Sequence, residues 1–303
     1  MMKKSIGLAL ACLMLMAFSS SAVAQDGSWR VILKDAIEFG GVSDQTLMDN
    51  AFRHAISQGT SVQEILSEVR AINPDVMEKA MASAFAVVAV SGDAIDAAVA
   101  SGADIAVVAK AALRAGMDVG SFTMAAIQAG GDPLVVTMEA VKVGGAPEAV
   151  IPMALEVSTN TRAVVQGALA GGADQEMTMR SAIASNGDMV GATQGAMQAG
   201  ANAGDLTATL IDMGVAAQTS VATVMAAGGD VGVVVASAVE MGVSDEEIIQ
   251  ASQIAGVRPE VVAVAVQAVA DDQPIGETGT TGGTPEPPTF IVVSPPDDDV
   301  SPN

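Results

Sequence analysis

The side chains best suited to metal or acid–base chemistry in this chain are acidic, amide or hydroxyl residues that recur at a fixed spacing. They occupy nine positions separated by fourteen residues or a multiple of it: Asp104, Asp118, Asp132, Asn160, Asp174, Asp188, Asn202, Asp230 and Ser244. At 130–132 and 228–230 the Asp follows two glycines, as in turns that bind calcium. Such calcium turns need a nine-residue spacing and parallel strands, so we favour helix N-caps as the role of these residues.

Other residues that could bind a metal or catalyse a reaction are few. His54 is the only histidine and Cys12 the only cysteine, so neither a His pair nor a Cys-based metal site can form. Met177 and Met179 could bind copper(I), although methionine also fills irregular Ala-rich cores. No nucleophile elbow or phosphate-binding loop is present. We therefore expect no enzyme, no cofactor and no metal site.

The spacing belongs to a repeat of fourteen residues, which runs twelve times without a gap from Gly102 to about Val269. Position one of the unit is Gly in ten repeats, and Ser158 and Asn186 occupy it in the other two. Gly, and next to it Asn, tolerates the left-handed backbone that ends a helix. Position one therefore predicts a helix stop, two residues before each N-cap.

The remaining positions predict one helix of about eleven residues in each unit. Position four holds Pro133, Pro147 and Pro259, where the first helical turn needs no N–H. Positions seven, eleven and twelve are mostly apolar and share one helix face, whereas position thirteen is mostly polar and should face solvent. Threonines at position eight could suggest an ice-binding face, but they form no continuous row: Thr123, Thr137, Thr193 and Thr207.

These units predict an all-α fold, an α-solenoid of short antiparallel helices. Two fourteen-residue units make one αα hairpin of about 28 residues, and hairpins stack. A single coiled coil would be broken by the recurring Gly, Asp and Pro, and a β-solenoid is opposed by the Ala content and the aligned N-caps. In architecture the array resembles HEAT, armadillo and tetratricopeptide repeats, although it has none of their signatures, so the resemblance implies shape alone. Gln253 and Gln267 at position twelve predict a polar capping end.

Residues 1–24 have the pattern of a secretory signal peptide. Lys3 and Lys4 precede an apolar run from Ile6 to Phe18, and Ala22-Val23-Ala24 is a small-x-small cleavage site. The run is too short to span a membrane as a retained anchor. We expect export to the periplasm or the extracellular space, and a mature chain without cysteine.

Residues 25–101 predict an N-terminal helical capping region with imperfect repeats. Helices are expected at 28–39 and 43–57, followed by two units that begin at Gly59 and Asn73. This region also contains the only tryptophan and several of the basic residues. Trp29 and Arg30 are therefore candidate contacts for a partner.

Residues 270–303 form a tail rich in Gly, Thr, Pro and acidic residues, which predicts disorder. The exception is a short β-prone segment at 290–293, made of Phe290, Ile291, Val292 and Val293 between proline pairs. Either this segment is an apolar stretch flanked by residues that prevent aggregation, or it adds a strand to the sheet edge of a partner.

The strongly negative net charge disfavours polyanions as partners of this chain. The chain carries −22, and removing the two signal lysines leaves −24. Nucleic acids and anionic lipids need Lys and Arg to neutralise phosphate, so neither is expected. The sequence predicts an exported, non-catalytic helical scaffold that binds a protein partner. The alternative is a self-associating component of an extracellular matrix, filament or surface coat.

Overall fold

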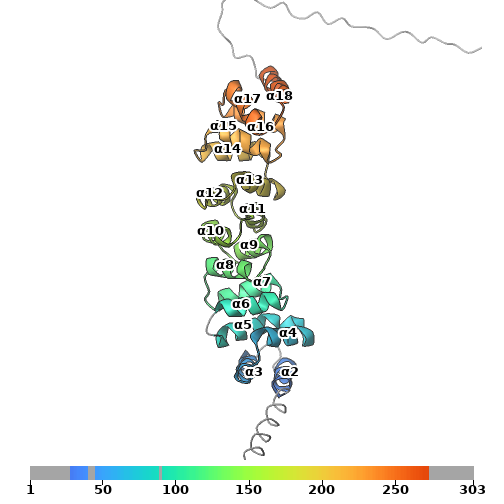
Figure 1. The fold of residues 1–303 in the computed structure, drawn as a ribbon. Coiled ribbons are helices and arrows are strands. Elements are labelled where there is room, and N and C mark those ends of the chain that lie inside the picture. The colour runs from blue at the N-terminus through green and yellow to red at the C-terminus, as the bar shows by residue number, and fades with distance from the viewer. Residues whose placement is uncertain (1–27, 40–44, 89–90, 273–303) are drawn as a thin grey trace, which may run out of the picture.

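The computed structural model describes residues 28–39, 45–88 and 91–272 (Figure 1). All regular structure in these ranges is helical. The N-terminal region contains α2 (Ser28–Phe39), α3 (Gln45–Ser57), α4 (Val62–Ile72), the 3-10 turn η1 (Pro74–Val76), α5 (Met77–Val87) and α6 (Ser91–Ala100). The twelve repeats form α7 (Ile105–Arg114), α8 (Val119–Gln128), α9 (Pro133–Lys142), α10 (Pro147–Val157), α11 (Thr161–Ala170), α12 (Gln175–Ala184), α13 (Met189–Gln198), α14 (Ala203–Asp212), α15 (Ala217–Ala226), α16 (Val231–Glu240), α17 (Asp245–Ile254) and α18 (Pro259–Asp272).

The predicted helix stops are confirmed at eleven of the twelve repeats. All ten position-one glycines have positive φ, and Asn186, at φ 57°, is the only residue other than glycine with positive φ within the described residues. At Gly116 the chain closes a Schellman motif: Gly116 N–H donates to the Leu113 carbonyl and Met117 N–H to the Ala112 carbonyl, at 3.0 and 3.1 Å. The same pair of bonds recurs at the other position-one glycines, so the helices that precede them end in the same geometry.

The predicted helix starts are confirmed as well. Each of the nine Asp, Asn and Ser residues accepts a hydrogen bond from a backbone N–H in the first turn of its helix. At Ser244 the arrangement is a full capping box with Glu247. Pro133, Pro147 and Pro259 are the first residues of α9, α10 and α18.

The helices stack in two columns, because each helix from α3 onward packs most extensively against a helix two places before or after it in the chain. Even-numbered helices form one column and odd-numbered helices the other, and Figure 1 shows α8, α10 and α12 beside α9, α11 and α13. Two consecutive helices therefore make one 28-residue repeat, and the all-α solenoid fold is confirmed.

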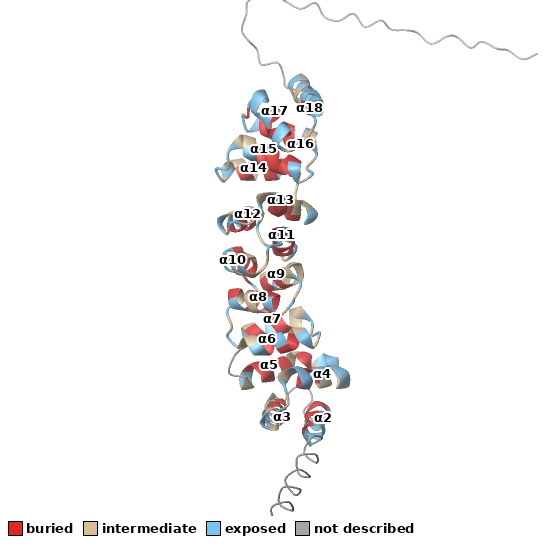
Figure 2. Ribbon diagram, viewed as in Figure 1, coloured by how far each residue is buried: buried red, intermediate tan, exposed pale blue. Residues whose placement is uncertain are grey.

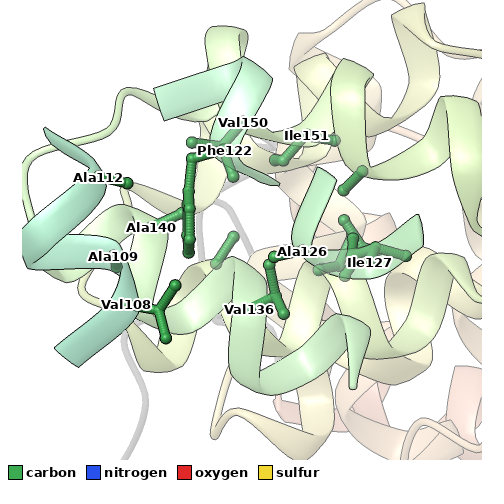
Figure 3. Packing of buried hydrophobic residues seen from close by; sticks show 14 of the residues in the cluster. Val108, Ala109, Ala112, Phe122, Ala126, Ile127, Val136, Ala140, Val150 and Ile151 are labelled. Atoms are coloured by element: carbon green, nitrogen blue, oxygen red, sulfur yellow. The ribbon is translucent and has the colours of Figure 1, made fainter. Parts of the chain in front are cut away.

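The core runs continuously between the two columns (Figure 2). All twelve residues at position seven are 0% exposed, from Val108 in α7 to Val262 in α18. Position eleven is also buried except in α18, position twelve is mostly half-buried, and position thirteen is exposed throughout. In Figure 3, Phe122 of α8 lies among small side chains such as Ala112, Ala140 and Val150, which come from the helices around it. Small residues at these positions allow the helices to approach closely.

Two glycines outside position one permit the closest backbone contacts. An added Cβ at Gly167 in α11 would lie 2.3 Å from the Leu134 carbonyl oxygen of α9. At Gly195 in α13 it would lie 2.3 Å from the Arg162 carbonyl oxygen of α11. The odd column is therefore tightest along α9, α11 and α13.

The structure excludes an ice-binding face and corrects two details of the sequence analysis. The four threonines at position eight are 0% exposed, because position eight packs into the core, so they form no surface for ice. Helix α18 continues to Asp272, so residues 270–272 of the expected tail are helical. The capping end is only partly polar, since Ile254 and Val264 are 69% and 70% exposed.

Candidate functional site

The recurring aspartates are engaged as helix caps and do not form a reactive cluster. Asp118 is representative: its carboxylate accepts from Gly120 N–H and Ser121 N–H at 2.9 and 3.0 Å. Hydrogen bonds from the side chain and backbone of Ser121, together with that from Gly120, lower the pKa of Asp118. Within the described ranges no group of three or more His, Cys, Asp or Glu side chains is placed to hold a metal ion.

The other candidate reactive residues, His54, Met177 and Met179, do not form a shared site either. His54 is half-buried in α3, and its Nε2 lies 2.9 Å from Gln58 Nε2. Met179 is buried in the core, whereas Met177, two residues earlier on α12, is 41% exposed. The two sulfur-bearing side chains therefore occupy different environments.

Trp29 and Arg30 join α2 to α4. The Trp29 side chain is only 1% exposed, and the Arg30 guanidinium lies over its ring at 4.6 Å from the ring centre. Arg30 also forms ion pairs with Glu64 and Glu68 of α4, at 2.7 and 3.3 Å. A partner can therefore reach Arg30 but not the Trp29 ring, and contact of either residue with a partner stays a prediction.

The tail segment Phe290, Ile291, Val292 and Val293, like the signal peptide at 1–24, lies outside the described residues. Both remain predictions. Across the parts of the chain that are described, no helix combines the length and the apolar character that a membrane crossing requires.

Charge is divided between the two helix columns. Between residues 91 and 244, nine acidic residues do not cap a helix, and eight of them lie on even-numbered helices. These eight are Asp93, Asp96, Glu148, Glu156, Glu176, Asp205, Asp212 and Glu240. In the same range four of the five basic residues lie on odd-numbered helices: Lys110, Arg114, Lys142 and Arg162. We call the surface formed by the eight acidic residues the acidic column.

Position thirteen makes the division clearest, because it lies in the last turn of each helix. It carries Arg114 and Lys142 on odd-numbered helices, and Glu156, Asp212 and Glu240 on even-numbered ones. Cations in the last turn are favoured by the helix dipole, whereas anions there are disfavoured. Local helix stability therefore explains the basic residues of this position but not the acidic ones.

The acidic column contains a groove between α10 and α12, with a volume of about 610 Å³. Its floor and walls include Pro152, Met153, Leu155 and Ala184, and its rim carries Glu148, Glu156 and Arg180. Arg180 pairs with Glu176 at 2.5 Å, whereas neither Glu148 nor Glu156 has an ion-pair partner within the described residues. We call this the α10–α12 groove.

Helix α10 departs from the repeat at several points beside this groove. Its N-cap position is Ala146, which forms no side-chain cap, and Ser158 at position one is extended, with φ −133°. Pro152 lies inside the helix, and because proline has no N–H, the Glu148 carbonyl receives no helical hydrogen bond from it. Pro152 therefore lies in the lining of the groove, whereas Ala146 and Ser158 lie at the two ends of the same helix.

Sequence reasoning missed both features, although signals for them were present. The alternation of charge at position thirteen has a period of 28 residues, twice the period that was used to align the units. Pro152 and Ser158 are also visible as departures from the repeat pattern. Comparisons with protein-family models, curated proteins and solved structures found no match for this chain.

Proposed function

We propose that the chain is an exported, non-catalytic helical-repeat scaffold that binds a protein partner in the periplasm or outside the cell. The observation that carries this proposal is that, between residues 91 and 244, eight of the nine non-capping acidic residues lie on one helix column; beyond this range, α17 of the other column carries Asp245, Glu246 and Glu247. Solubility requires charge on the surface, but it does not require charge of one sign on one side. A one-sided acidic surface along a solenoid suits a partner that is basic and elongated.

Recovery of a specific partner tests the proposal. A tagged mature chain, residues 25–303, is cross-linked in the envelope and medium of its native host, and captured proteins are identified by mass spectrometry. A second bait ends after Asp272, which keeps helix α18 complete and removes the tail segment 290–293. The proposal expects a reproducible partner, and capture of none from either compartment would overturn it.

The two baits also locate the contact. If the shorter bait loses the partner, the tail holds it, as the strand-addition hypothesis predicts. If the shorter bait keeps it, the partner contacts the helical array.

A structural role as a filament or coat component is the second candidate, and exposed apolar residues at both ends of the array favour it. Val31, Ile32 and Leu47 are 61%, 39% and 40% exposed in α2 and α3, and Val264 is 70% exposed in α18. Head-to-tail contact between such ends produces open filaments. Sedimentation at increasing protein concentration tests this role, which a strict monomer would exclude.

A further inference from the structure

From the chemistry of the α10–α12 groove we infer that it is the docking site for a basic segment of the partner, in which an apolar side chain is flanked by Lys or Arg. The inference rests on the proposed function, because it names the part of the scaffold that contacts the partner. Four of the residues that line the groove supply apolar atoms, and two carboxylates at its rim lack an ion-pair partner among the described residues.

The groove offers three kinds of contact to such a segment. Met153, Leu155 and the ring of Pro152 can cover an apolar side chain. Glu148 and Glu156, both exposed, line the groove near the two ends of α10, where each can pair with a cation. The Glu148 carbonyl, which receives no hydrogen bond from Pro152, can accept one from a backbone N–H or an ammonium group of the segment.

The carboxylates of the groove favour binding of a basic segment over binding of the chain's own apolar tail segment. The tail segment at 290–293 is flanked on one side by Asp297, Asp298 and Asp299. These acidic residues would approach Glu148 and Glu156, so a contact between tail and groove would bring like charges together. Arg180, the one cation of the groove, is already paired with Glu176.

The unfavourable local sequence of α10 also supports the groove as a docking site. A proline inside a helix and an uncapped helix N-terminus each lower helix stability, and α10 has both, at Pro152 and Ala146. Natural sequences tend to break local rules at functional sites. Among the twelve repeats, the α10 unit combines these departures, and it lines one side of the groove.

Direct binding of peptides to the mature chain tests the inference. The probe is a fluorescein-labelled hexapeptide of alternating Lys and Leu, measured by fluorescence anisotropy at low salt. We expect it to bind, a Glu–Leu peptide not to bind, and a Lys–Ser peptide to bind at least tenfold more weakly because it lacks the apolar side chain. Absence of Lys–Leu binding, or equal binding of the Lys–Ser peptide, would overturn the inference.

Variants place the contact in the groove. Glu148→Gln with Glu156→Gln should weaken Lys–Leu binding at least tenfold, and Ala184→Phe should do so by filling the groove at an exposed position. The matched controls should bind as the unchanged protein does. They are Asp212→Asn with Glu240→Gln, which removes the same charge elsewhere on the acidic column, and Ala170→Phe, which changes position thirteen of the neighbouring helix α11.

Equal losses in the test and control variants would show general electrostatic attraction and overturn the groove as the site. Circular dichroism and thermal unfolding establish that each variant is folded. The outcome also separates the two proposals: a captured partner that the groove variants still hold contradicts the groove alone, whereas capture of no partner contradicts the scaffold function.

Discussion

At the scale of single residues, the helix caps explain why so many aspartates recur without forming a site. Each cap oxygen satisfies a backbone N–H that has no partner inside its helix. Caps are present in nine repeats, and Ala146 and Ala216 occupy the same position without one. These alanines provide a natural comparison for measuring what a cap contributes.

The Asp118 cap should contribute measurably to stability. We expect Asp118→Ala to lower the free energy of unfolding by about 1 kcal/mol, because Gly120 N–H and Ser121 N–H lose their acceptor. Conversely, Ala216→Ser should raise it by a similar or smaller amount, since the φ and ψ of Ala216, −54° and 133°, are close to those of the Asp230 cap, −60° and 122°. Urea denaturation measures both, and equal stability of all three proteins would contradict the capping role.

The same residue predicts a pH dependence. Hydrogen bonding in the fold lowers the pKa of Asp118 below its ordinary value of 3.8, so its contribution to stability is full above that value. It is lost as the pH falls through the lowered folded-state pKa. Asp118→Asn keeps a capping oxygen but cannot titrate, so its melting temperature should fall less steeply in acid than that of the unchanged protein. Identical acid profiles for the two proteins would contradict the prediction.

Gly195 should be required for the close approach of α13 to α11. Its added Cβ would lie 2.3 Å from a backbone oxygen, so Gly195→Ala should destabilise the protein by about 1–3 kcal/mol despite the better helix propensity of Ala. Gly92 of α6 is the control, because an added Cβ there meets nothing within 4 Å. Gly92→Ala should leave stability unchanged or raise it by up to about 1 kcal/mol, as thermal unfolding can measure.

At the scale of elements, the stacking of helices is uneven, and the weakest junction lies before α14. Helix α14 makes only sparse contacts with α12 and α13, whereas α9, α11 and α13 pack extensively. Two polar contacts cross the junction: Gln175 Nε2 donates to Thr209 Oγ1 at 3.3 Å, and Thr223 Oγ1 lies 3.6 Å from Met189 Sδ. In a solenoid, stability depends on such nearest-neighbour interfaces.

The helices before this junction and those after it should unfold at different denaturant concentrations. In native-state hydrogen exchange at increasing denaturant, amides of α7–α13 and of α14–α18 should lose protection at different concentrations, because little surface couples the two groups. Mass spectrometry of peptic fragments locates the boundary. A single concentration at which all helices lose protection would contradict it.

At the scale of the whole molecule, the acidic column should lower the stability of the fold, because several of its anions lie in the last turns of helices. The triple variant Glu156→Gln, Asp212→Asn and Glu240→Gln should raise the melting temperature, because anions leave the last turns of α10, α14 and α16 and repulsion falls. Glu260→Gln, which removes an anion from a first turn, should not raise it. The gain should shrink at high salt, where such charges are screened. No gain at low salt would contradict this account.

How much of the molecule follows from sequence depends on the range of the interactions involved. Helix starts at residues such as Asp118 and stops at residues such as Gly116 depend on contacts within about one turn. Burial of position seven follows from the period of the helix. These features could be predicted because neighbours in sequence are neighbours in space.

The sequence by itself therefore determined the all-helical repeat, its boundaries and its core positions. Only the tertiary structure decided that alternate helices share a column, which places Glu156, Asp212 and Glu240 on the same column although they are separated by 56 and 28 residues in the sequence. It also decided that Trp29 is buried beneath Arg30, and that a groove opens beside Pro152. Each of these depends on contacts between separate helices, and such contacts are set by packing geometry that no single fourteen-residue unit contains.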